Sequence, residues 1–138
     1  MEILAGAEIV GEGAAKSDGD ARAQLITRRK TVHDRALFDA MVVKMRITEP
    51  GIRVGAMFGC PAVFIGRRMA FCVYGSAIGV KIPQADAARL IASRMAAAFR
   101  PYGRPPMKEW IELQATAADF GKVVPILTLA LRYAKGTA

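Results

Sequence analysis

Histidine and cysteine are scarce in this sequence of 138 residues, which holds one histidine, His33, and two cysteines, Cys60 and Cys72. A structural zinc site needs four such ligands, commonly in C-x-x-C pairs, and these two cysteines lack that spacing. We therefore expect no metal site and no cofactor. His33 stands near the start of a predicted helix and is interpreted as a surface residue.

Residues arranged for catalysis are also missing. The serines fall in the amino-terminal stretch, a predicted turn and a predicted helix, and none lies in a G-x-S-x-G motif. Glu109 and Glu112 are three residues apart on a predicted strand, so they point to opposite faces. The glycines around Gly55 and Gly59 match neither a Walker loop nor a dinucleotide fingerprint. We expect no catalytic residues and no enzymatic activity.

Long hydrophobic runs are absent. The most apolar stretch, residues 123–131, is interrupted by Pro125 and Thr128 and is far below the ~20 residues that a membrane-spanning helix needs. The amino terminus carries Glu2 and Glu8, which do not suit a secretory signal. With few cysteines and no export signal, we expect a cytoplasmic protein that does not contact membranes.

Charge is unevenly distributed along the chain. Residues 1–20 sum to −4, whereas residues 21–138 hold 19 basic and 7 acidic residues and sum to +12. A basic surface favours anionic partners such as nucleic acid, but positive charge also keeps an apolar domain soluble, and both interpretations stand. Residues 1–30, rich in glycine, alanine and acids, are predicted to be a flexible tail or an over-long start. The single domain is expected over residues 31–138.

A helix followed by four short strands is predicted for the first half of this domain. Thr31 and Asp34 have the spacing of a capping box, and a stripe of apolar residues continues as far as Met45 before Glu49-Pro50-Gly51 ends the helix. Turn residues then separate four apolar segments. We predict an antiparallel meander over residues 53–58, 62–65, 69–74 and 77–82.

The second half is predicted to add two helices and one strand. Residues 84–99 are expected to form a helix with Ile91, Met95, Ala98 and Phe99 on one face. A strand is predicted over residues 108–113 and a last helix over residues 122–135. The fold class is therefore α+β, in the order α-β-β-β-β-α-β-α. It should be a two-layer domain with about five antiparallel strands and helices mainly on one face.

The relation between the cysteines depends on the loop after Ile65. A two-residue loop, Gly66-Arg67, sets Pro61 opposite Cys72 and places Cys60 on the other face. A three-residue loop would place both cysteines diagonally on one face. In either case they are interpreted as structural thiols.

Two segments are candidates for a binding surface. Arg67 and Arg68 form a basic hairpin tip, which is either a phosphate contact or a solvated turn. The proline-rich loop after Phe99 offers Tyr102, Arg104 and Trp110. These three are either anchors of a rigid recognition loop or, as we favour, part of a stiff connection whose aromatic residues cap the core.

The last helix is apolar around most of its circumference. Val123, Ile126, Ala130 and Tyr133 are expected to face the sheet, which leaves Val124, Leu127 and Leu131 on one flank. We expect a homodimer through that flank, because two-fold pairing is the commonest way to bury a surplus apolar face. The alternative is that the first helix or the tail covers the flank within one chain.

Several segments together resemble the TfoX amino-terminal domain family, also called the TfoX/Sxy family. They are Met57-Phe58-Gly59, the hairpin over residues 66–71, the strand around Gly79-Val80-Lys81-Ile82 and the loop from Phe99 to Trp110. The resemblance covers residues 31–134 and departs at Cys60, where many relatives carry a second glycine. It implies a small α+β domain similar to secretion-chaperone-like folds. Full-length relatives regulate natural competence and carry a second domain, so a chain ending at Ala138 is expected to be a stand-alone member.

These observations predict a non-enzymatic binding or regulatory domain that acts through protein–protein contacts. The alternative is a domain that binds anions or nucleic acid, weakly and without sequence preference, through Arg67, Arg68, Arg100 and Arg104.

Overall fold

The computed structural model describes residues 32–137. The acidic tail predicted for residues 1–30, and Thr31 as a helix cap, lie outside this part of the chain.

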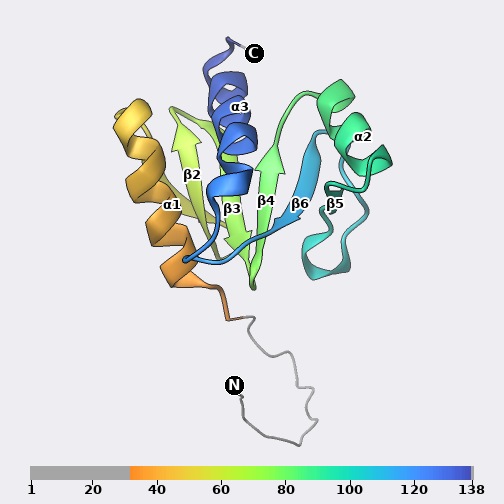
Figure 1. Cartoon of the computed structure of the whole chain (residues 1–138), viewed down its shortest axis with the longest axis horizontal. Coiled ribbons are helices and arrows are strands. Elements are labelled where there is room, and N and C mark those ends of the chain that lie inside the picture. The colour runs from red at the N-terminus through yellow and green to blue at the C-terminus, as the bar shows by residue number, and fades with distance from the viewer. Residues whose placement is uncertain (1–31, 138) are drawn as a thin grey trace, which may run out of the picture. The chain divides into compact units, whose positions relative to one another are not determined.

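The described chain is an α+β domain with one antiparallel sheet, as the sequence predicts (Figure 1). The sheet has six strands in the order β1-β2-β3-β4-β6-β5. The strands are β1 (Arg53–Met57), β2 (Cys60–Ile65), β3 (Arg68–Tyr74), β4 (Ala77–Lys81), β5 (Ala97–Ala98) and β6 (Trp110–Gln114). The helices are α1 (Arg35–Thr48), α2 (Gln84–Ala92) and α3 (Val124–Lys135), with short 3-10 turns η2 (Pro101–Gly103) and η3 (Gly121–Val123).

The start of α1 is set by an aspartate. Oδ1 of Asp34 accepts a hydrogen bond of 3.0 Å from the backbone N–H of Leu37, so Asp34 is the N-cap. The expected capping box placed Asp34 at the third helical position. That expectation is wrong, because Asp34 is itself the N-cap and the helix starts three residues later than expected. Such a cap contributes about 1 kcal/mol. The predicted apolar stripe is confirmed, because all its members are buried: Leu37, Phe38, Met41, Val42 and Met45.

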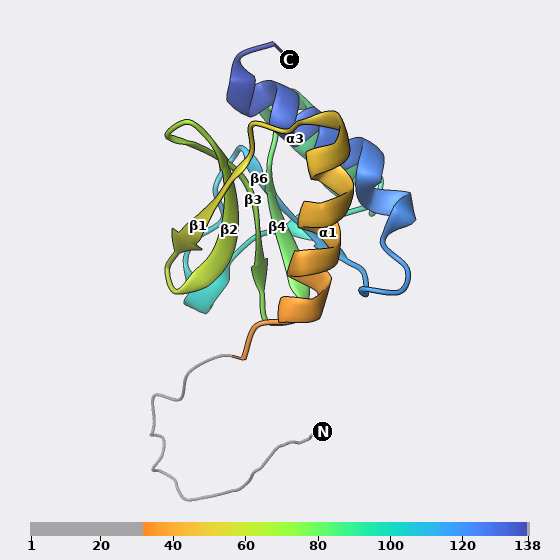
Figure 2. The ribbon, with the colours of Figure 1, turned by 90° about the vertical axis from the view of Figure 1, so that its left-hand side faces the viewer.

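The main core lies between the sheet and the helices. Figure 2 shows α1 and α3 on the same side of the strands, and the buried Ala87 and Leu90 of α2 belong to the same apolar cluster. On that side β4 contributes Ile78 and Val80. The prediction of helices on one face is confirmed.

Helix α2 is shorter than predicted. It ends at Ala92, and the chain then reverses so that Ala97 and Ala98 pair with Glu112 and Ile111 of β6. The expected helical face over residues 91–99 is consequently wrong: Phe99 is fully buried, whereas Met95 is 66% exposed. Apolar periodicity alone did not distinguish a continued helix from a turn followed by a short edge strand.

A second, smaller core covers the opposite face of the sheet. It consists of Cys60, Ala62, Met69, Cys72, Phe99 and Trp110. The rings of Phe99 and Trp110 lie 5.6 Å apart between centroids. Phe99 also lies directly over β4, where a Cβ atom added to Gly79 would come within 2.6 Å of its ring. Phe99 and Trp110 therefore cap this face. The structural interpretation of the loop is confirmed for Trp110 but not for Tyr102, which is exposed.

The two cysteines share this second core because of a β-bulge. The loop after β2 has two residues, as one alternative assumed, and pairs Ile65 with Arg68. The register then shifts, so that Ala62 rather than Pro61 lies opposite Cys72. The shift puts Cys60 and Cys72 on one face, and the placement on opposite faces is wrong. A bulge adds one residue to a strand and so reverses the face of every residue beyond it.

Candidate binding surface

Two tight turns with strained backbones meet at one end of the sheet. The first joins β1 to β2 and consists of Phe58, with φ 52°, and Gly59, with φ 79°. Two-residue hairpin turns with positive φ at both positions normally carry asparagine or glycine at the first. A phenylalanine there costs free energy, on the order of 1–3 kcal/mol. The strain is a local property of the Met57-Phe58-Gly59 motif.

The second strained turn is η2. Tyr102 has φ 56° and is followed by Gly103 with φ 73°. The backbone N–H of Tyr102 donates a hydrogen bond of 3.1 Å to the hydroxyl of Tyr74, and the two tyrosine rings pack edge to face at 5.0 Å. The left-handed conformation of Tyr102 is thus held by β3.

A hydrogen bond joins the two turns. The hydroxyl of Tyr102 donates to the backbone carbonyl oxygen of Phe58 at 2.7 Å. The guanidinium carbon of Arg104 lies 4.1 Å from the centroid of the Phe58 ring, within the range of a cation–π interaction. Despite these contacts Phe58 is 41% exposed and Tyr102 is 52% exposed. We name Phe58, Tyr102 and Arg104 the Phe58–Tyr102 surface.

His33 fixes the neighbouring turn between β3 and β4. Its Nδ1 accepts a hydrogen bond of 2.9 Å from the backbone N–H of Gly75, and its ring lies 5.7 Å from that of Tyr74. An accepting Nδ1 is unprotonated, which corresponds to the neutral imidazole. Burial also lowers the pKa of His33 below its ordinary value. The interpretation of His33 as a simple surface residue is wrong, because the side chain is half-buried and braces this turn.

The thiols beneath this surface are protonated at neutral pH. Burial raises the pKa of Cys60, and burial with the neighbouring Cys60 raises the pKa of Cys72 to about 12. Both cysteines are free and buried. Because the thiolate is the reactive form, they act here as packing groups, which agrees with their interpretation as structural thiols.

The predicted binding residues do not form one surface. Tyr102 and Arg104 lie together, whereas Trp110 is only 8% exposed and belongs to the second core. Arg67 and Arg68 lie at the β2–β3 hairpin, at the opposite end of β2 from Phe58. Six strand residues separate these ends, which corresponds to about 17 Å. The fold thus does not join the basic hairpin to the Arg100–Arg104 loop.

Phe58 is the member of the surface that sequence reasoning missed. It was noted only within the Met57-Phe58-Gly59 motif. A usable signal was present, because a large aromatic residue directly before glycine at a hairpin turn is unusual.

The expected dimer flank is mostly internal. Leu127 is 0% exposed and Leu131 is 3% exposed, and both belong to the main core, while Val124 is half-buried. With Ala130 and Ala134 the two leucines form the buried face of α3, which packs on the sheet. The expected orientation of this helix is therefore wrong, since Ile126 and Tyr133, which were expected to face the sheet, are only half-buried. The homodimer surface predicted from Val124, Leu127 and Leu131 is wrong as well, because the two leucines are buried within one chain.

Two further features are absent from residues 32–137. Between residues 32 and 137 no helix combines the length and apolarity required to cross a bilayer. Within the same range no three histidine, cysteine or acidic side chains gather closely enough to hold a metal ion.

Comparisons of the chain with protein-family models, with curated proteins and with solved structures find no match. The resemblance to the TfoX family therefore stays a prediction.

Proposed function

We propose that this domain is a non-enzymatic binding and regulatory module that recognises a protein partner through the Phe58–Tyr102 surface. One observation carries the proposal: two exposed aromatic residues occupy left-handed backbone conformations and are locked together by the bond from the Tyr102 hydroxyl to the Phe58 carbonyl. Strain of this kind gathers at ligand-binding and switch regions.

The composition of the surface suits protein recognition. Aromatic residues and arginine are enriched among the residues that dominate binding energy at protein interfaces. The rings are also presented rigidly, because Tyr74 and Arg104 hold them from two sides. A pre-ordered surface loses little conformational entropy on binding.

We place this activity in the cytoplasm. The two cysteines are free rather than paired, which suits a reducing compartment. The regulation of competence implied by the TfoX resemblance is one form that such a protein-binding role would take.

The proposal is tested by site-specific crosslinking in cells. A photo-reactive phenylalanine analogue at position 105, an exposed proline beside Arg104, leaves the Tyr102–Phe58 bond intact. It should form a discrete adduct with a protein, and nuclease treatment should not remove it. The same analogue at Val43, an exposed position on α1, is the control. Equal adducts from both positions, or adducts lost with nuclease, would contradict the proposal.

The β2–β3 hairpin supports a second candidate function, the binding of anions or nucleic acid. Nη2 of Arg53 donates a hydrogen bond of 2.7 Å to the carbonyl oxygen of Gly66, and the same guanidinium lies 4.6 Å from the Phe64 ring centroid. These contacts brace the hairpin tip, where Arg67 and Arg68 are exposed. Three arginines thus gather at one hairpin tip. Arg100 and Arg104, which the sequence analysis assigned to the same binding surface, are not part of it.

A further inference from the structure

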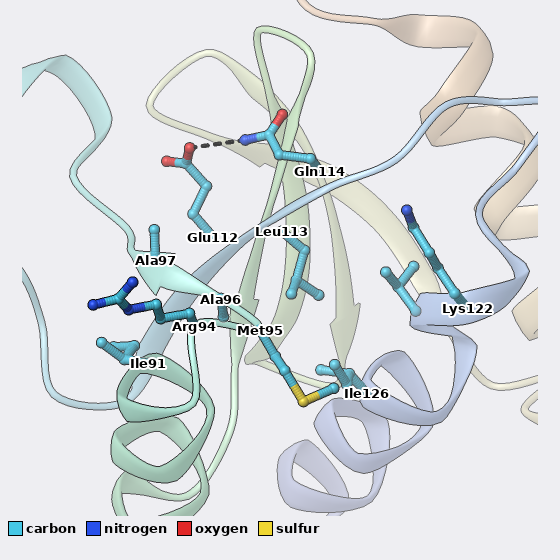
Figure 3. A pocket seen from close by; sticks show the side chains of 11 residues that line it. Ile91, Arg94, Met95, Ala96, Ala97, Glu112, Leu113, Gln114, Lys122 and Ile126 are labelled. Atoms are coloured by element: carbon cyan, nitrogen blue, oxygen red, sulfur yellow. Dashed lines mark hydrogen bonds between the residues drawn. The ribbon is translucent and has the colours of Figure 1, made fainter.

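A cavity of about 550 Å³ lies between the end of α2 and the start of α3 (Figure 3). Its size falls within the range typical of small-molecule sites. Most of its lining is apolar: besides two alanines, the apolar side chains are Ile91, Met95, Leu113, Val123 and Ile126. In Figure 3 the Met95 side chain extends towards Ile126 below Leu113. Leu113 and Val123 are buried at its base, whereas Ile91 and Met95 are exposed. Covering these two exposed side chains with an apolar ligand would release water from them.

Two cations border this apolar floor. Figure 3 shows Arg94 on one side, beside Ile91, and Lys122 on the other side of Leu113. Neither cation forms an ion pair with another residue of the range 32–137. The one acid in the lining, Glu112, accepts a hydrogen bond of 3.1 Å from the side-chain amide of Gln114. The cavity is therefore apolar and, on balance, positively charged.

Arg94 occupies a position where glycine would be more stable. It follows the end of α2 with φ 65°, and the backbone N–H of Met95 bonds to the carbonyl of Leu90, the pattern of a helix ending in a left-handed residue. Helix α3 ends in the same way but carries Gly136 there, with φ 84°. The chain thus accepts backbone strain to keep an arginine at the cavity, and such strain is a mark of binding sites.

We propose that this cavity binds a small apolar carboxylate, with its hydrocarbon part on Leu113, Met95 and Ile126 and its carboxylate on the guanidinium of Arg94. The planar guanidinium fork matches a carboxylate in two parallel hydrogen bonds, which an ammonium group such as Lys122 cannot provide. Lys122 adds positive charge from the other side of the cavity and disfavours cationic ligands. This site is separate from the Phe58–Tyr102 surface and does not depend on its function.

The probes are sodium hexanoate, octanoate and decanoate below their micelle concentrations, added to the ¹⁵N-labelled full-length chain. We expect chemical-shift changes at residues 91–97, 113, 114 and 122–126, which surround the cavity. Affinity should rise about fourfold with each added methylene, because each buried CH₂ contributes a fixed free energy. Octylamine, with the same chain and the opposite charge, should bind at least tenfold more weakly than octanoate.

The decisive variant is Arg94→Gly. It should weaken octanoate binding about tenfold through loss of one charge-assisted contact, and it should raise the melting temperature because it removes the left-handed strain. Arg89→Ala is the matched control, since Arg89 pairs with Asp86 at 2.8 Å on the same helix, away from the cavity. It should leave octanoate binding unchanged.

Four results would overturn the proposal. Three are equal binding of octanoate and octylamine, shifts confined to another surface, and unchanged octanoate affinity in a folded Arg94→Gly variant. The fourth is loss of octanoate binding in Arg89→Ala, because general surface charge would then explain the effect.

Discussion

The hydroxyl of Tyr102 lies 2.7 Å from the carbonyl oxygen of Phe58 and donates a hydrogen bond to it. This contact joins residues 44 positions apart and connects the β1–β2 turn to the loop that covers the second core. It is the structural basis of the Phe58–Tyr102 surface, because each of the two turns on its own would be a strained and exposed loop.

Removing the Tyr102 hydroxyl tests whether this bond holds the two turns together. We expect Tyr102→Phe to lower the free energy of unfolding by about 0.5–1.5 kcal/mol, the usual net contribution of one hydrogen bond. Urea unfolding of the variant and the wild-type chain measures the difference. An unchanged free energy of unfolding would mean that the turns keep their conformation without the bond.

The packing of Phe99 over β4 predicts that Gly79→Ala is strongly destabilising. The added Cβ would lie 2.6 Å from the Phe99 ring, so the ring must move and the second core must repack. Overpacking of this kind costs about 1–3 kcal/mol. Gly121→Ala is the control, because nothing lies within 4 Å of its added Cβ. Thermal unfolding should show a lower melting temperature for Gly79→Ala only.

His33 predicts a loss of stability at mildly acidic pH. Because burial lowers its pKa in the folded chain, the unfolded chain binds the proton more readily, and stability falls as pH decreases below the ordinary value of about 6.5. The bond from the Gly75 N–H to Nδ1 would be lost on protonation of that nitrogen. We expect wild type to lose more stability between pH 7.5 and 5.5 than His33→Gln does. If urea unfolding shows the same loss of stability for wild type and for His33→Gln, other groups cause the pH dependence.

The basic hairpin predicts weak, salt-dependent contact with nucleic acid. Phosphate contacts release counterions, so affinity for a random DNA duplex should fall steeply as salt rises from low to physiological concentrations. Arg67→Glu with Arg68→Glu should abolish binding, whereas Arg100→Glu with Arg104→Glu should leave it close to wild type, because those residues lie at the other end of β2. Fluorescence anisotropy of a labelled duplex measures the DNA affinity of both double variants. Salt-independent binding that discriminates between sequences would contradict this candidate function.

The fold class, the meander and the buried stripe of α1 could be predicted because each rests on local periodicity. The bounds of α2 could not, since the residues after Ala92 keep a helical pattern of apolar side chains while pairing with β6 decides their conformation. The shared face of Cys60 and Cys72 was also beyond local reasoning, because it depends on a register shift after Val63. Long-range packing, rather than propensity, fixed both.

The candidate site was only half predictable. The loop pattern indicated Tyr102 and Arg104, but it could not separate them from Trp110, whose burial depends on contact with Phe99. Pairing between Phe58 and Tyr102 was not predictable at all, because the two residues are 44 positions apart and four strands lie between them. The dimer flank was wrongly predicted for a related reason: a helix that is apolar around most of its circumference does not reveal which side packs on the sheet, and in α3 that side includes Leu127 and Leu131.

The most direct test of the central claim is Phe58→Gly, measured for both stability and partner crosslinking from position 105. Glycine adopts the positive φ of 52° without steric cost. We therefore expect the variant to be at least as stable as wild type and about 1–2 kcal/mol more stable than Phe58→Ala, which keeps the strain. The account predicts that this well-folded variant loses the protein adduct. A stable Phe58→Gly variant that crosslinks its partner as efficiently as wild type would contradict it.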